Sequence, residues 1–361
     1  MVSSSHGRND RPLNVLLVLT SLARTSGGGH TFAEGLVSYL ASASGVALTV
    51  VVPRDTRTPV DNAGIEGVGT IRVRSVVGSA RIFRDVLGVR RWARQMHADV
   101  VVVPHEWASP AGRVPVVNVV QNILYLHEYG RRHYRLKALL MRGVARATVR
   151  HADGTIAVSR IAGDLWRART GAPALVIPQG VSPEFSEGMV CSPREDLLVV
   201  MTGTARYKNA DLALATVETA RRRGMRSRIV VVGLAEDAPA GLRVEAVGSL
   251  SREDLAGLFS RARAVMLSST LESFGLPAFE ALASGAAVVV AQGTAMSEWL
   301  GGYPSVLVAR PDAEGFADAI VSAMSMDDAS RRRVGDFDWR TVGMLWETAL
   351  REFAKQSGDR Q

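Results

Sequence analysis

Two carboxylates, Glu272 and Glu280, stand eight residues apart across a predicted junction between a loop and a helix. An apolar run at 264–267 predicts a strand before them, and Pro277 and Gly285 suit the first position and the end of the helix. The first N–H groups of a helix have no partner within it, so they bind oxygen-rich ligands. The two carboxylates would flank this helix tip. They could therefore hydrogen-bond two sets of hydroxyls on one ligand, such as those of a sugar and a ribose.

The residues around the pair favour this role over the alternative, in which Glu280 is a solvated helix residue and Glu272 an ordinary loop carboxylate. Residues 271–285 read LESFGLPAFEALASG and resemble the signature of retaining glycosyltransferase family 4, which has the two-domain GT-B fold. Ser273 replaces a glycine of the usual pattern, which is a small departure. The resemblance implies that Glu272 binds the donor sugar and Glu280 the nucleotide ribose. It assigns the sugar-binding backbone amides to Phe274, Gly275 and Leu276.

A cationic pair, Arg206 and Lys208, follows the strand predicted at 197–201. The family has an Arg and a Lys here that reach the diphosphate. Lys208 matches directly, whereas Arg206 lies closer to the lysine than the family arginine does. A fixed cation would stabilise the charge of a departing diphosphate, and Lys is retained here in a chain with three lysines and forty arginines. The alternative is a solvated pair of loop side chains.

The resemblance also points to two nucleotide-binding segments. Gly28 and Gly29 belong to a glycine-rich loop after the first predicted strand, where glycine allows the backbone to approach a ligand. In the family this loop lies near the donor phosphates, although glycine-rich turns are common. Leu250 lies in the segment 247–251, where the family holds the nucleotide base largely by backbone contacts.

The acceptor side departs from the family pattern. Many relatives place a His beside the reacting centre, but here Gln121 or Asn122 occupies that position. These amides offer hydrogen bonds and no titratable group. His105, which follows the strand predicted at 100–103, is a further candidate for the active cleft, and a purely structural histidine is its alternative.

Strands and helices alternate twice along the 361 residues, and a chain of this length usually holds two domains. The pattern predicts α/β domains with doubly wound parallel sheets, as in the GT-B fold. Predicted strands are 13–19, 46–52, 71–73, 100–103, 114–120, 154–158 and 174–177, then 197–201, 227–232, 244–247, 264–267 and 286–291. We expect a disordered tail at 1–12 and two domains at 13–185 and 186–338. The resemblance implies that the first is the acceptor domain, that the second is the donor domain, and that a last helix at 339–361 returns to the first domain.

The net charge of +8 is unevenly distributed. Residues 1–185 carry 23 Lys/Arg and 12 Asp/Glu, so this half has a net charge of +11 and could meet an anionic partner. A helix predicted at 130–152 has Arg131, Arg135, Arg142, Arg146 and Arg150 on one face and Leu136, Leu140, Val144 and Ala147 on another. It could lie on an anionic membrane. We favour an ordinary surface helix whose apolar side packs on the sheet.

Other features of the sequence bear on the cellular location of the protein and on disulfide and metal sites. No apolar run is long enough to span a membrane, and the first dozen residues lack the apolar core of a secretory signal. Cys191 is the only cysteine, so no intrachain disulfide or cysteine metal site is expected. These observations favour the cytoplasm, including the inner face of the membrane. Asp336 and Asp338 imitate an Asp-x-Asp metal motif, but we expect an N-capping role and no metal site.

Together the motifs and the resemblance that they carry imply a retaining, metal-independent glycosyltransferase that moves a sugar from a nucleotide-diphosphate sugar to an acceptor hydroxyl. No cofactor and no nucleic-acid partner is expected. Two alternatives remain from the sequence. One is a different enzyme on the same fold, such as a sugar-nucleotide epimerase or a phosphorylase, and the other is a non-catalytic protein that binds an anionic surface.

Overall fold

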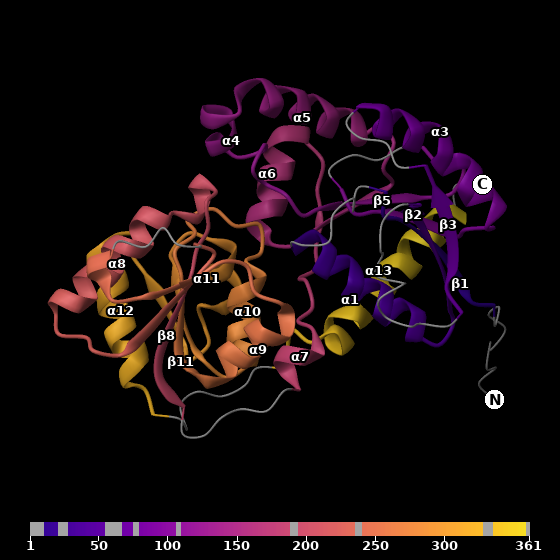
Figure 1. The fold of residues 1–361 in the computed structure, drawn as a ribbon. Coiled ribbons are helices and arrows are strands. Elements are labelled where there is room, and N and C mark those ends of the chain that lie inside the picture. Colours follow the sequence, from indigo (N-terminus) through magenta and orange to yellow (C-terminus); the bar gives the residue numbers. More distant parts are fainter. Residues whose placement is uncertain are drawn as a thin grey trace, which may run out of the picture.

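The computed structural model describes residues 11–20, 28–54, 67–74, 79–105, 110–187, 194–234, 240–327 and 335–358. They form two α/β units, each built on a parallel sheet (Figure 1). This architecture confirms the predicted fold class. Residues 1–10 of the predicted tail, the start of the glycine-rich loop and Cys191 lie outside the described residues.

The first unit has a seven-stranded sheet in the order β3-β2-β1-β4-β5-β6-β7. Its central strands β4 and β5 are short, mainly apolar runs that are buried along their whole length, as expected for strands covered on both faces. The strands are β1 (Leu13–Val18), β2 (Val46–Pro53), β3 (Gly69–Val73), β4 (Val100–Val103), β5 (Val116–Val120), β6 (Gly154–Ala157) and β7 (Leu175–Val176). The helices are α1 (Gly28–Ser42), α3 (Ser79–Gln95), α4 (Glu128–His133), α5 (Arg135–Thr148) and α6 (Arg160–Thr170).

The short helix α7 (Pro183–Ser186) precedes the second unit, whose six-stranded sheet has the order β10-β9-β8-β11-β12-β13. The strands are β8 (Glu195–Met201), β9 (Arg228–Val232), β10 (Glu245–Val247), β11 (Ala262–Leu267), β12 (Ala287–Ala291) and β13 (Val306–Ala309). The helices are α8 (Ala210–Arg222), α9 (Arg252–Arg261), α10 (Leu276–Ala283), α11 (Ala295–Leu300) and α12 (Ala313–Ser325), with 3₁₀ turns η1 (Arg206–Lys208) and η2 (Ala240–Leu242). Both sheets have parallel pairing throughout their described registers.

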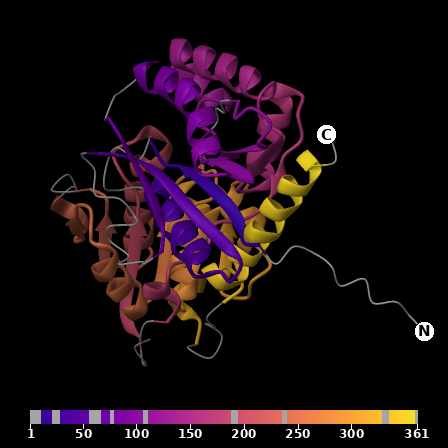
Figure 2. The same ribbon diagram turned by 90° about the vertical axis from the view of Figure 1, so that its right-hand side faces the viewer.

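The last helix, α13 (Trp339–Gly358), returns to the first unit and runs beside α1 (Figures 1 and 2). The ring of Phe32 on α1 lies 5.2 Å from that of Trp346 and 5.9 Å from that of Trp339. Trp346 is fully buried, and its indole N–H donates to the carbonyl of Pro178 at 3.2 Å. The predicted return of the C-terminal helix is therefore confirmed. Asp338 accepts a hydrogen bond from the N–H of Thr341 at 2.6 Å, which is the capping role predicted for it.

The predicted helix at 130–152 differs from the structure in two respects. It is divided at Tyr134 into α4 and α5. Its buried side consists of small residues, Ala138, Ala145 and Thr148, so the expectation that Leu136 and Leu140 pack on the sheet is wrong. These leucines are 81% and 65% exposed, and Leu139 is 70% exposed.

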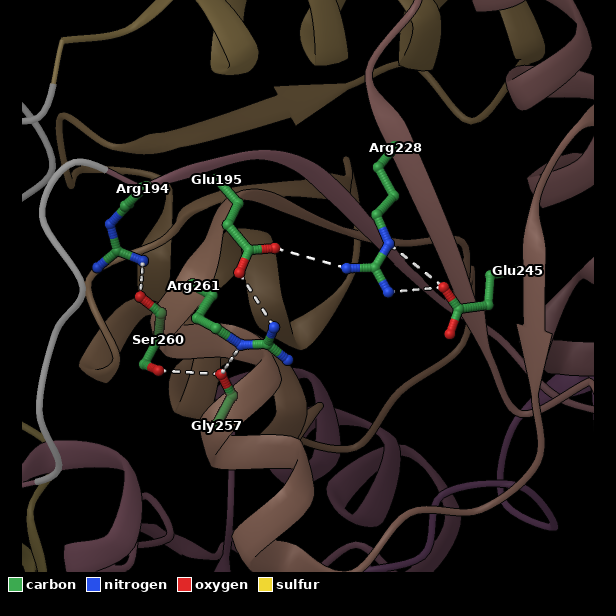
Figure 3. Close-up of polar contacts among 7 residues, drawn as sticks. All are labelled: Arg194, Glu195, Arg228, Glu245, Gly257, Ser260 and Arg261. Atoms are coloured by element: carbon green, nitrogen blue, oxygen red, sulfur yellow. Dashed lines mark hydrogen bonds and ion pairs between the residues drawn. The ribbon is translucent and has the colours of Figure 1, made fainter.

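A buried arginine, Arg194, joins the ends of two helices of the second unit, and Figure 3 shows its bond to Ser260. Nη1 of Arg194 donates to the carbonyls of Phe259, Ser260 and Ala262 at the end of α9, at 3.1, 2.9 and 2.9 Å. Nη2 donates to the carbonyl of Ser284 at the end of α10, at 2.7 Å. The carbonyls at a helix C-terminus lack intrahelical donors, so one guanidinium satisfies both helix ends. The helices that approach the site from this side are thereby fixed to each other.

Candidate functional site

A cavity of about 700 Å³ lies between the two units. On one side it is lined by the start of α1, which follows β1, and by the loops after β4 and β5. On the other side it is lined by the loops after β8 and β11. These strands are neighbours in their sheets, so the cavity lies where the carboxyl ends of both sheets meet. This is the usual place for a ligand in open α/β sheets, and the volume suits a nucleotide-sized ligand.

Ten of the predicted site residues line this one cavity. The first unit contributes Gly28, Gly29, His105, Gln121 and Asn122, and the second contributes Lys208, Glu272, Phe274, Gly275 and Leu276. The structure therefore brings together side chains from positions up to about 250 residues apart in the sequence. Arg206, Leu250 and Glu280 do not line it.

The tip of α10 owes its shape to Gly275. This residue has a φ of +85°, which an L side chain rarely adopts. A Cβ atom here would also lie 2.3 Å from Cγ of Met296, so the turn requires glycine. The helix begins at Leu276, and Pro277 follows in the first turn, one position later than predicted. Phe274 is buried and its ring stacks on that of Phe279 at 4.0 Å, which anchors the turn.

Lys208 and Glu272 form an ion pair in the wall of the cavity, with Nζ 2.6 Å from Oε1. Their side chains are 30% and 13% exposed, so the pair is partly shielded from water. The backbone at Lys208 is fixed because its carbonyl accepts hydrogen bonds from the hydroxyls of Ser268 and Thr202, at 2.6 and 3.1 Å. The loops after β8 and β11 therefore hold one cation and one anion at a set position.

The opposite wall includes two amide side chains that do not titrate, Gln121 and Asn122. Nε2 of Gln121 is buried and has no hydrogen-bond partner among the described residues. Oε1 of the same side chain lies 3.6 Å from the position of a Cβ atom built on Gly29. The side-chain oxygen of Asn122 accepts a hydrogen bond from the N–H of Leu124 at 3.0 Å. An oxygen-rich ligand would supply the acceptor that the Gln121 amide lacks.

Several lining residues were not among the predicted site residues. They include Tyr125, Lys137, Met141, Gln179 and Tyr207. Nζ of Lys137 lies 4.8 Å from the ring centroid of Tyr125, a cation–π distance. Because lysine occurs only three times in the chain, the rarity of Lys137 was a signal that could have identified it. Tyr207 could have been found from its place between Arg206 and Lys208.

Comparison with known families matches both units. The family described as "Glycosyltransferase Family 4" matches residues 26–185, and the family described as "Glycosyl transferases group 1" matches residues 196–326. The chain is a family 4 glycosyltransferase. This glycosyltransferase is 36% identical over 124 residues to a glycogen synthase of Mycobacterium tuberculosis (strain CDC 1551 / Oshkosh). That alignment covers 32% of the chain and only 30% of the glycogen synthase.

Solved structures share the fold of the glycosyltransferase over nearly its whole length. The sucrose-phosphate synthase of Thermosynechococcus elongatus has a TM-score of 0.68 at 16% identity, covering 94% of this chain and 98% of that one. HepE of Anabaena in complex with UDP and glucose has a TM-score of 0.68 at 17% identity, covering 94% and 99%. At such identities the likeness concerns the GT-B fold.

Glu280 of the glycosyltransferase is buried at 3% exposure, so the alternative of a solvated helix residue is wrong. Burial raises the pKa of its carboxyl to about 7, an effect that nearby Arg252 partly opposes. Arg206 lies in η1 and is exposed outside the cavity, whereas Leu250 is half-buried and packs against the core. These three side chains therefore lie outside the cavity lining, and the roles expected for them require a ligand that extends beyond that lining.

The described residues contain neither a metal-ligating cluster nor a membrane-spanning helix. No group of three or more His, Cys, Asp or Glu side chains among them is arranged to hold a metal ion. No helix in the described part of the glycosyltransferase is both long and apolar enough to cross a membrane.

Proposed function

We propose that this glycosyltransferase transfers a sugar from a nucleotide-diphosphate sugar to an acceptor hydroxyl, with retention of configuration at the anomeric carbon. The observation that carries the proposal is the Lys208–Glu272 pair at 2.6 Å, held against the α10 tip in the cavity between the units. Cation, carboxylate and helix amides are the groups needed by a phosphate and by sugar hydroxyls. HepE, which has the same fold, is described in complex with UDP and UDP-glucose, and this supports a nucleotide-sugar donor.

On the donor side, each group has a separate task. The ammonium of Lys208 stabilises the negative charge that develops on the diphosphate as the bond to the sugar breaks. Glu272 accepts hydrogen bonds from the sugar hydroxyls and favours positive charge at the anomeric carbon. The N–H groups of Phe274, Gly275 and Leu276 bind oxygens of the donor, because the start of α10 favours negative charge. Arg206 is expected to add positive charge to the diphosphate side after domain closure.

The acceptor approaches from the wall that contains His105, Gln121 and Asn122. The bond between the anomeric carbon and the diphosphate oxygen breaks, and the acceptor oxygen forms its bond on the same face. The acceptor proton passes to the departing diphosphate oxygen, so no side-chain base is consumed. The amides of Gln121 and Asn122 support this route because they can position a hydroxyl but cannot form a glycosyl intermediate as a carboxylate would.

We also propose that the reaction needs no metal ion. Lys208 and the N-terminal amides of α10 supply the positive field at the diphosphate that a divalent cation supplies in other phosphate sites. Addition of EDTA should leave the rate unchanged. A strict requirement for a divalent cation would contradict this part of the proposal.

The decisive experiment combines binding and turnover. A thermal-shift panel of UDP-, GDP-, TDP- and ADP-sugars identifies the donor, and we expect Lys208→Ala and Glu272→Ala each to lose about 100-fold or more in turnover with that donor. Lys355→Ala, which removes a lysine of α13, is the matched control and should retain full activity. Near-normal turnover of both site variants would refute the assignment. Incubation with donor alone tests for epimerisation, and added inorganic phosphate tests for phosphorolysis.

We also propose that α4 and α5 bind the surface of an anionic membrane at its cytoplasmic face. Leu136, Leu139 and Leu140 form an exposed apolar surface on α5, and Arg132 and Arg135 are exposed beside it. Apolar side chains flanked by cations suit the boundary between lipid headgroups and acyl chains. Two helices of the first unit thus offer this surface at one extremity of the molecule (Figure 1).

The membrane proposal is tested by sedimentation with phosphatidylglycerol/phosphatidylcholine vesicles. The wild-type chain should bind at low salt, whereas a Leu136→Ser/Leu140→Ser variant should lose most of the binding and keep its thermal midpoint. Val321→Ser, at an exposed apolar residue of α12, is the control. Equal binding by the double variant would refute the assigned surface.

A further inference from the structure

Arg252 stands at a junction of four elements beside the cavity. It is the first residue of α9, directly after Leu250 and the capping residue Ser251. Its Nη1 donates to the hydroxyl of Thr31 on α1 at 3.0 Å, so the side chain reaches from the second unit to the first. Its Nε lies 3.6 Å from a carboxylate oxygen of Glu184 on α7, and its guanidinium lies 5.2 Å from the ring centroid of Phe185.

The contact between Arg252 and Glu280 leaves one polar atom of each side chain without a hydrogen bond to any described residue. Nη1 lies 3.5 Å from Oε1 of Glu280, which is an electrostatic contact but too long for a strong hydrogen bond. Oε1 of Glu280 is buried and has no hydrogen-bond partner among the described residues, and the same is true of Nη2 of Arg252. Buried polar atoms of this kind destabilise a protein unless a partner arrives. One acceptor and one donor therefore remain unsatisfied on two side chains that face each other.

We propose that Arg252 is a specificity-determining residue for the nucleotide of the donor, and that with Glu280 it brackets one ribose hydroxyl. A hydroxyl is the simplest group that satisfies both side chains, since it donates to the carboxylate and accepts from the guanidinium. This proposal rests on the proposed nucleotide-sugar donor. The resemblance assigns ribose binding to the carboxylate alone, whereas the structure adds a cation from the base-binding side.

The arrangement has a consequence for the choice of donor. A site that hydrogen-bonds a substrate hydroxyl strongly rejects the analogue that lacks it, because its own buried polar groups are then left unpaired. The glycosyltransferase should therefore prefer ribonucleotides over nucleotides that lack the bracketed hydroxyl. The preference should depend on Arg252, because a carboxylate alone cannot donate to the hydroxyl oxygen.

The test measures binding by isothermal titration calorimetry. Nucleoside diphosphates of the base that the wild-type chain prefers are compared in three forms: ribo, 2′-deoxy and 3′-deoxy. The wild-type chain should bind one of the deoxy forms about tenfold or more weakly than the ribo form. In Arg252→Met, which keeps an unbranched stem without donors, this ratio should fall to about twofold or less. Arg252→Lys keeps the charge but not the fork of donors, so its ratio should lie between the two.

Two controls separate this role from a structural one. Thr31→Val removes the acceptor of Nη1 and should leave the ribo-to-deoxy ratio unchanged, because Thr31 does not touch the proposed hydroxyl position. Arg310→Met removes an arginine that is 65% exposed and pairs with Asp312, and it should behave as wild type. Far-ultraviolet circular dichroism confirms folding, and if Arg252→Met does not fold, Arg252→Lys carries the comparison.

The outcomes are distinct. If both Arg252 variants keep the wild-type discrimination, or if the wild-type chain binds all three forms equally, the proposal for Arg252 is wrong while a nucleotide donor stands. If the wild-type chain binds no nucleoside diphosphate of any base, the proposed function itself fails.

Discussion

Replacement of Arg194 by methionine should destabilise the second unit strongly. The guanidinium is buried at 6% exposure and donates four hydrogen bonds to carbonyls at the ends of α9 and α10. Methionine fills much of the space but leaves these carbonyls without their donor. Hydrogen bonds to charged groups contribute about 1.5–3 kcal/mol each, and they are not additive. Loss of a buried hydrogen-bond network is among the largest effects of a single substitution, and we take about 3–5 kcal/mol as the expected loss.

Differential scanning calorimetry provides the measurement. For a domain of this size, each kcal/mol corresponds to about 2–4 °C, so the transition of the second unit should fall by at least about 6 °C. Arg261→Met is the matched control, because it removes the same charge from a side chain that is 41% exposed and pairs with Glu195 on the surface (Figure 3). Such a pair contributes about 0–1 kcal/mol. A loss of less than about 1 kcal/mol in Arg194→Met would refute the reasoning.

Two other predictions concern α10. Gly275→Ala should lose about tenfold or more in turnover and about 2 kcal/mol in stability, because alanine is strained at a φ of +85° and its Cβ meets Met296. The control Gly302→Ala has open space around it and should change neither turnover nor stability in the same activity and unfolding assays. The raised pKa of Glu280, about 7 against a usual 4.5, means that the folded state binds its proton more tightly than the unfolded state. The proton on Glu280 therefore stabilises the folded state fully below pH 4.5, and this stabilisation is lost as the pH rises to about 7. The free energy of unfolding from urea titrations should fall by about 3 kcal/mol over this range, and Glu280→Gln should remove this pH dependence.

The elements of the fold were accessible from the sequence where one local pattern decides the structure. The strands at 100–103 and 264–267 are apolar runs that the parallel sheets bury on both faces, and the structure has strands there. The α10 tip was predictable because proline and glycine mark its ends. The buried side of the helical stretch 130–152 was not predictable, since its leucines and arginines at helical spacing suit either a buried or an exposed face. Only the tertiary packing, which buries Ala138 and Ala145, decides between them.

The sequence identified many of the residues that line the site but not the contacts between them. Ten predicted residues line one cavity, but nothing in the sequence indicated that Lys208 and Glu272, 64 residues apart, would form an ion pair. Nor did it indicate Arg252, whose contacts come from Thr31, Glu184 and Glu280 in three distant segments. Such contacts depend on how the two units face each other, and no local pattern encodes that arrangement.

The position of α13 has a consequence for biosynthesis. Domains usually fold in order as they leave the ribosome, the earlier one first. Here the layer that covers α1 includes Trp346, which is translated after the whole second sheet. The side of Phe32 that contacts Trp339 and Trp346 would therefore stay uncovered until α13 has been translated. A ribosome stalled before Trp339 would carry a first unit whose α1 lacks these aromatic contacts, and exposed apolar surface of this kind favours aggregation of a nascent chain.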